Sequence, residues 1–394
     1  LQEIFLGEEE GGPGFKAFGS LAVCAQEENR FIDCYLPMLR AFAENDPRTA
    51  GADEELMEQS IGFFREIEDF MRYLDSDVFL FRRFSRDMKE LFRRNVSVGL
   101  LGDGDRSSVL ALSSVEEGKG GAISNLAFKK MPPFPDAESV ETYRLLFDRY
   151  HNLLREMGLH PPRHGMRRIS RGDGTYTVFT TQSRLPVGSI GSNVISLVPD
   201  EDCITFFKMV LRELEKVVEY NRNHSVQVGI DIAVSNWGLE GFDPDNPVVK
   251  GDERLYYVDT STPLIREEGR ELLDSELFLK SVPFFIRPFV RWFYLEGILS
   301  RYYDTRSLMM DLLADFVAID KENLLPRLVD EANQFLDGQN CGPGNLTVDG
   351  VKRHRRKDQR ARAFLRRCRK LDYLLQTRLL GRSYPYHVPR GDGR

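Results

Sequence analysis

The sequence predicts a protein of the α+β class, with a small antiparallel sheet followed by a mainly helical part. Two observations carry this prediction. Between about residue 95 and residue 130, short β-like runs alternate with Gly-rich turns, and from residue 187 onward apolar residues recur mostly at helical spacing. Residues 1–94 have the pattern of a separate helical extension. We therefore divide the chain into three parts: 1–94, 95–186 and 187–394.

Composition is that of an ordinary globular protein, with 394 residues, 41% hydrophobic and 29% charged. A net charge of -7 argues against a surface built throughout for nucleic acid. The five cysteines are scattered without a C-x-x-C pair, which is typical of reduced thiols and predicts neither disulfides nor a zinc site. Because no apolar run approaches about 18 residues and the first residues are acidic, we expect a cytoplasmic protein without a transmembrane segment.

The elements follow in order along the chain. The run "EQSIGFFREIEDFMRYL" predicts a helix in the extension, and "NVSVGLLGDGDRSSVLALSS" with "GGAISNLAFKKM" predicts three antiparallel strands. A helix comes next, ending near Gly158, and it carries an apolar stripe of Val140, Tyr143, Phe147, Tyr150 and Leu154. The run "RRISRGDGTYTVFTT" predicts a hairpin, and residues 182–186 after it are expected to form a hinge.

The third part opens with a helix from Asp202 to about Tyr220. The stretches "NWGLEG" and "RLYYVDTSTP" predict two short strands joined by a long turn. From about residue 270 to residue 336 the pattern is helical, and residues 352–370 form a basic helix or tail.

The first candidate site is the loop "LLGDGDRSSV". Gly102 and Gly104 allow backbone N–H groups to approach a phosphate closely, and the small Ser107 keeps the turn low. No Gly-Lys-Ser/Thr follows, so the loop is not a P-loop. Taken alone, an ordinary hairpin turn explains it equally well.

The second candidate is the strand "LAFKKM". Lys129 shares a strand face with Ala127, whereas Lys130 points to the other face. An inward lysine beneath the Gly-rich hairpin could neutralise phosphate oxygens. The alternative is two solvated lysines at the end of a strand.

The third candidate consists of three oxygen-bearing side chains. Asp231 and Asn236 lie five residues apart in "VGIDIAVSNW", and Asp259 ends the apolar strand in "LYYVDTSTP". Phosphoryl transfer needs a group that orients the attacking hydroxyl, and oxygen ligands for Mg²⁺. Each residue alone could equally be a cap or turn residue, so their order in the chain carries the argument.

This succession of Gly-rich hairpin, strand lysine, helix, hinge, long helix, D-x-x-x-x-N loop and strand-borne Asp resembles the protein-kinase-like fold, including its aminoglycoside and choline phosphotransferase branches. More narrowly, "LLGDGDRSSV", "FKKMPPF", "DIAVSNW" and "YVDTSTPL" resemble a bacterial branch of kinase-like proteins classified as a domain of unknown function. The resemblance covers roughly residues 95–310. It implies two lobes, a β-sheet N-lobe and a helical C-lobe.

The resemblance also implies roles for individual residues. Gly102, Gly104 and Ser107 would cover the phosphates of ATP, and Lys129, or its neighbour Lys130, would contact them. Asp231 would be the catalytic acid, while Asn236 and Asp259 would hold Mg²⁺. The helix partner of the lysine would be Glu141 or, seven residues on, Asp148, and we favour Glu141.

Two positions depart from the family's pattern. Gly229 stands where a His normally precedes the catalytic Asp, and Thr260-Ser261 replace the usual Phe-Gly after the metal-binding Asp. These departures weaken the likeness to regulated protein kinases more than the likeness to small-molecule phosphotransferases.

We therefore expect an ATP- and Mg²⁺-dependent phosphotransferase that acts on a hydroxyl of a small molecule or peptide. Transfer of a nucleotidyl group stays open. The alternative is a pseudokinase that binds nucleotide and serves as an interaction module. The basic segment 352–370 is a candidate site for an anionic partner such as phospholipid headgroups, RNA or an acidic substrate, or else a solvated helix paired with the acidic remainder of the chain.

Overall fold

The computed structural model describes most of the chain from residue 96 onward. The described ranges are 96–103, 108–114, 126–170, 174–274, 279, 282–288, 290, 295–341 and 345–380. The predicted N-terminal helical extension, together with Gly104 and Ser107, lies outside them. The described chain is mixed α+β, as the sequence predicts. It separates into two compact units, which cross over at Thr142/Tyr143, Pro162/Arg163, Arg184/Leu185 and Arg367/Cys368.

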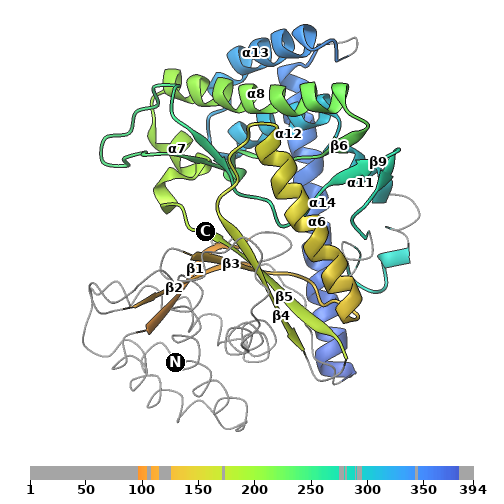
Figure 1. The fold of residues 1–394 in the computed structure, drawn as a ribbon. Helices are drawn as coiled ribbons and strands as arrows, with labels where there is room; N and C mark the ends of the chain where they lie inside the picture. The colour runs from red at the N-terminus through yellow and green to blue at the C-terminus, as the bar shows by residue number, and fades with distance from the viewer. Residues whose placement is uncertain are drawn as a thin grey trace. The chain divides into compact units, whose positions relative to one another are not determined.

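The first unit is built on a five-stranded antiparallel sheet with the strand order β1-β2-β3-β5-β4 (Figure 1). Its strands are β1 (Val96–Asp103), β2 (Ser108–Ser114), β3 (Leu126–Lys130), β4 (His164–Ser170) and β5 (Tyr176–Ser183). Val178 and Phe179, neighbours on β5, are both fully buried. Since successive strand residues point to opposite faces, both faces of the sheet are covered at β5. The three predicted strands and the predicted hairpin are confirmed.

Helix α6 (Ala137–Glu156) connects β3 to β4 and runs through both units. Asp136 caps its start, because its Oδ1 accepts a hydrogen bond from Ser139 N at 2.7 Å. All five residues of the predicted apolar stripe are buried, with at most 2% of the surface of any of them exposed. The helical spacing of the apolar residues therefore identified the buried face correctly.

The second unit is organised around helix α8 (Asp200–Asn223), preceded by α7 (Gly191–Leu197). The predicted helix is confirmed, and the apolar residues that recur at helical spacing along it, from Ile204 to Val217, are buried, whereas Val218 near its C-terminal end is partly exposed. Phe207 of α8 meets Phe316 of α12 (Thr305–Ala318) edge to face, with ring centroids 5.7 Å apart. Helix α13 (Leu325–Gly338) also contacts α8, through the ion pair between Lys208 and Glu331 at 2.7 Å.

Two small antiparallel sheets follow α8 in the chain. One has the order β10-β9-β6 and the other pairs β7 with β8. The strands are β6 (Val226–Val228), β7 (Trp237–Leu239), β8 (Leu255–Tyr257), β9 (Ile265–Glu267) and β10 (Arg270–Glu271). The predicted pair of short strands is confirmed as β7 and β8, with Trp237 opposite Tyr257.

The predicted start of the helical region near residue 270 is wrong. Arg270–Glu271 pairs with β9, because Glu268 and Gly269 both adopt positive φ, the conformation of a tight hairpin turn. Helical residues recur from residue 279 onward, and the longer helices α11 (Leu295–Ser300) and α12 follow. The basic segment lies in the long helix α14 (Val348–Leu374), drawn in blue in Figure 1. A five-residue π-helix, Leu375–Leu379, continues from α14.

Candidate functional site

The loop that carries Asp231 connects β6 to β7 and is fixed by its backbone. Ile230 and Ile232, on either side of Asp231, are fully buried. Gly229 N donates to Leu264 O at 2.9 Å, and Ile230 N donates to Tyr302 O at 3.1 Å. These contacts anchor the approach to Asp231 on two other segments of the second unit.

Gly229 has little room for a side chain. A Cβ atom there would lie 3.0 Å from Leu264 Cβ and 3.0 Å from the ring of Tyr303. Close packing against Leu264 and Tyr303 therefore leaves no space at this position for a side chain as large as histidine.

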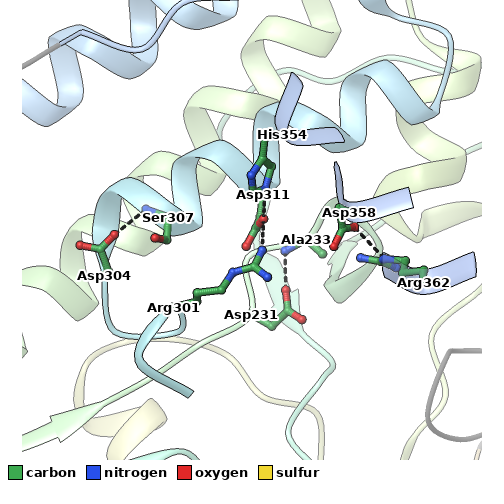
Figure 2. A network of polar contacts seen from close by, with 9 residues as sticks. All are labelled: Asp231, Ala233, Arg301, Asp304, Ser307, Asp311, His354, Asp358 and Arg362. Atoms are coloured by element: carbon green, nitrogen blue, oxygen red, sulfur yellow. Dashed lines mark hydrogen bonds and ion pairs between the residues drawn. The ribbon is translucent and has the colours of Figure 1, made fainter. Parts of the chain in front are cut away.

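The carboxylate of Asp231 lies in a densely packed, negatively charged environment. Its Oδ1 accepts a hydrogen bond from Ala233 N at 3.1 Å (Figure 2). Burial, and then the nearby carboxylate of Asp259, raises the pKa of Asp231 to about 6. Asp259 therefore acts on Asp231 electrostatically, although the two acids are 28 residues apart in the chain.

Asn236 ends a 3₁₀ turn (Val234–Asn236) on the same loop. Its Nδ2 donates to the backbone carbonyl of Asp231 at 3.1 Å, which orients the side-chain amide and leaves its oxygen as the end suited to a cation. The backbone carbonyl of Asn236 accepts from Val258 N at 2.9 Å. Asn236 thus connects the Asp231 loop to the residue that precedes Asp259.

Asp259 lies two residues beyond the end of β8. Ser261 Oγ donates to its Oδ1 at 3.4 Å, and both Thr260 and Ser261 are buried. The structure therefore brings together Asp231, Asn236 and Asp259, the three oxygen-bearing residues predicted from the sequence.

Two tyrosines of α6 hold these loops through hydroxyl groups that the sequence analysis treated only as part of an apolar stripe. Tyr150 Oη donates to Gly229 O at 2.8 Å, and Tyr143 Oη donates to Ser261 O at 2.7 Å. Burial, followed by the charge of Asp259, raises the pKa of Tyr143, so its phenol stays protonated as a donor. One helix face thus supports both acidic segments of the site.

A third hydroxyl group links Asp231 to this support. Asp231 N donates to Tyr257 Oη at 2.9 Å, and the Tyr257 side chain interacts with that of Tyr150. Tyr257 and Tyr150 therefore hold the backbone on either side of Ile230, through Asp231 N and Gly229 O.

The sequence analysis also missed two acids on α12, Asp311 and Asp315. Asp315 Oδ2 accepts from Val234 N at 2.9 Å, inside the turn between Asp231 and Asn236. Burial raises the pKa of Asp315 to about 6, although the Val234 hydrogen bond and two arginines of α14 oppose the rise. Two acids four residues apart in the otherwise apolar run "LMMDLLADFVA" were the signal that could have revealed them.

Asp311 forms the centre of the network in Figure 2. Its Oδ1 lies 2.5 Å from Arg301 Nη2 and 2.7 Å from His354 Nε2 of α14. Its negative charge contributes to the raised pKa of Asp231. Helices α12 and α14 therefore shape the electrostatics of the Asp231 loop.

A family model described as "Family of unknown function (DUF6206)" matches residues 114–373, about two thirds of the chain. The chain belongs to the DUF6206 family. No curated protein matches it. The DUF6206 match includes Lys129, Asp231, Asn236 and Asp259, and it begins after the loop of Gly102–Ser107.

In this DUF6206 protein, the residues predicted to bind phosphate belong to the first unit. Gly102 lies near the end of β1 opposite Val109, beside a bulge that follows Leu100. Lys129 is half-buried on β3, between Val109 on one side and Thr180 on the other. Lys130 lies opposite Phe179 on β3, and its side chain is outside the described part.

The two candidates for the lysine's partner lie on α6, in different units. Glu141 is half-buried in the first unit. Asp148, in the second unit, forms an ion pair with Arg144 at 2.8 Å, one helical turn earlier. The choice of Glu141 stays a prediction.

The donor set limits which metal this DUF6206 site could hold. Among the described residues, no group of three or more His, Cys, Asp and Glu side chains is arranged to hold a metal ion. Zinc and calcium sites made only by protein normally need such a set. Magnesium retains several waters and uses one or two carboxylates with substrate phosphates, so Asp259 and the Asn236 amide fit Mg²⁺ carried in with a nucleotide. Across the described residues, no helix is both long and apolar enough to cross a membrane.

Proposed function

We propose that this chain is an ATP- and Mg²⁺-dependent phosphotransferase with a two-lobed, protein-kinase-like fold. The convergence of Asp231, Asn236 and Asp259 carries the proposal, because residues that far apart in the chain meet in the order and chemistry that phosphoryl transfer requires. The sheet order β1-β2-β3-β5-β4, with a half-buried lysine on β3 and a helix after it, supports it independently.

In this proposal Asp231 orients the acceptor hydroxyl and takes its proton. A carboxylate with a pKa of about 6 is mostly ionised at neutral pH yet more basic than an ordinary Asp, which suits a general base. The hydrogen bond from Ala233 N fixes the carboxylate, and the hydrogen bonds to Tyr257 and Tyr150 fix the nearby backbone. Preorganisation of this kind lowers the cost of reaching the reactive geometry.

Asn236 and Asp259 would hold Mg²⁺, and Lys129 with the Gly102 end of β1 would contact the nucleotide phosphates. The bound metal would neutralise charge on the phosphates and orient them. The acceptor would be a hydroxyl of a small molecule or peptide.

Nucleotide turnover tests the proposal directly. The wild type should convert ATP to ADP only with Mg²⁺, and Asp231→Asn should abolish ADP formation while still binding ATP. Asp245→Asn, an exposed acid in the loop between β7 and β8, is the matched control and should keep full turnover. Formation of AMP and pyrophosphate would indicate nucleotidyl transfer instead. Equal residual turnover in wild type and Asp231→Asn would refute the role of Asp231.

The second candidate is a nucleotide-binding pseudokinase. The replacement of the usual His by Gly229, in a site too tight for a side chain, is the observation that favours it. A thermal-shift titration separates the two functions. An active enzyme should need Mg²⁺ for tight ATP binding, and ATP at 100 times its dissociation constant should add about 2.7 kcal/mol to the free energy of unfolding. Stabilisation by ATP that ignores Mg²⁺, without turnover, would favour the pseudokinase.

A further inference from the structure

Helix α14 carries many more basic side chains than take part in contacts with the second unit. Its 27 residues contain eleven Lys or Arg against three Asp, in a chain whose net charge is -7. Some of the basic residues face the second unit, where Arg355 and Arg362 act on Asp315 and His354 contacts Asp311. Interactions with these two acids therefore explain the basic residues on one side of the helix only.

Four other basic residues lie on the opposite side and are exposed. Arg353, Arg356, Lys357 and Arg360, here called the basic face, follow the spacing i, i+3, i+4, i+7, so they share one side of α14. Within the described part of the chain, none of the four forms an ion pair. They line a hollow of about 340 Å³. Four like charges around one hollow repel one another, and an anion placed among them would relieve that repulsion.

Apolar side chains continue along the same side of the helix. Phe364 follows Arg360 by four residues and is 58% exposed, and Arg367 comes one turn later. Further along α14, Leu371 and Leu374 are 50% and 42% exposed. Exposed large apolar residues beside clustered lysines and arginines have the chemistry of a surface that touches lipid headgroups and the adjoining acyl chains.

We propose that this side of α14 binds the surface of a membrane rich in anionic phospholipid. The basic face would hold headgroup phosphates, and Phe364 would enter the boundary between headgroups and acyl chains. From Arg353 to Arg367 a straight helix extends about 21 Å, so these side chains can reach a flat surface together. Exposed leucines favour lipid over RNA, since an aliphatic side chain offers no ring on which a base can stack. This binding does not depend on the proposed phosphotransfer.

Vesicle flotation of the full chain tests the proposal. The wild type should bind phosphatidylcholine vesicles that contain about one third phosphatidylglycerol, fail to bind phosphatidylcholine alone, and be released by high salt. The variant R353Q/R356Q/K357Q/R360Q should bind several hundredfold more weakly, because each basic side chain near an anionic surface contributes about fivefold. F364S should bind about tenfold more weakly, even in low salt.

The control variant K208Q/R212Q/K250Q/R270Q removes the same number of exposed charges elsewhere in the second unit and should bind much more like the wild type. All the substituted side chains on α14 are exposed, so thermal melting should be unchanged. The wild-type comparison of the two vesicle types needs no variant. Equal binding to both vesicle types, no binding to either, equal losses in the two quadruple variants, or binding to single-stranded RNA but not to vesicles would each overturn the proposal.

Discussion

Tyr257 and Tyr150 bond the backbone on either side of Ile230 and interact with each other, which predicts a measurable coupling between the two tyrosines. Tyr150→Phe leaves the buried Gly229 carbonyl without its hydroxyl donor, and Tyr257→Phe leaves Asp231 N without its acceptor. An orphaned buried polar group costs about 1–3 kcal/mol. Each single variant should therefore lower the free energy of unfolding by that amount.

The double variant should cost less than the sum of the two single variants. Each single substitution also removes the interaction between the two hydroxyl groups, so the sum counts this interaction twice. A hydrogen-bond-like interaction contributes about 1 kcal/mol net, and the double-mutant cycle should return a coupling energy of that size. Because Tyr150 and Tyr257 fix the backbone around Asp231, ATP turnover should fall as well, while the affinity for nucleotide changes little.

Urea unfolding at neutral pH measures all four corners of the cycle. Tyr256→Phe is the matched control, since Tyr256 is the neighbour of Tyr257 on β8 and its hydroxyl bonds exposed Glu240 at 2.8 Å. Its loss should change the free energy of unfolding by less than about 0.5 kcal/mol. If Tyr150→Phe and Tyr257→Phe match this control, their hydrogen bonds do not support the loop; if their costs add fully, the two hydroxyl groups do not interact.

The remaining predictions concern packing and pH. Gly229→Ala should destabilise the protein by about 1–3 kcal/mol, because its Cβ would meet Leu264 and Tyr303. Gly297→Ala in α11, where the space around the Cβ is open, should instead stabilise the protein by about 0.5–1 kcal/mol. Chemical denaturation measures the free energy of unfolding of both variants. Asp315 has a folded-state pKa raised from 3.8 to about 6, so the stability it contributes is full below pH 3.8 and lost as the pH rises through 6. Asp315→Asn cannot lose that contribution, and its free energy of unfolding relative to wild type should rise by roughly 2 kcal/mol between pH 4 and pH 7. A pH-independent difference between the two would contradict the assigned pKa.

The sequence predicts those features of the fold that depend on local periodicity. The stripe of α6 and the strands β7 and β8 follow from apolar spacing within one element. The β9–β10 hairpin escaped prediction, because its strands are two to three residues long and rich in charge, so that only the positive φ of Glu268 and Gly269 defines the turn.

The acidic site could be predicted in part. Asp231 and Asn236 occupy one loop, and Asp259 ends a strand that was itself predictable. The supporting residues could not be predicted, since hydropathy treats Tyr143 and Tyr150 as part of an apolar face, and their hydroxyl partners lie 118 and 79 residues away in the chain. Only the folded arrangement of the second unit shows which carbonyl groups they reach.

The position of those two tyrosines explains how the second unit keeps two acids near one another. Burial, and then repulsion from Asp259, raises the pKa of Asp231. Tyr150 contacts the segment before Asp231, and Tyr143, two helical turns earlier on the same face of α6, contacts the segment after Asp259. Moving the acids apart would break at least one buried hydrogen bond to a rigid helix, at a cost of about 1–3 kcal/mol. The fold therefore maintains the repulsion between the two acids.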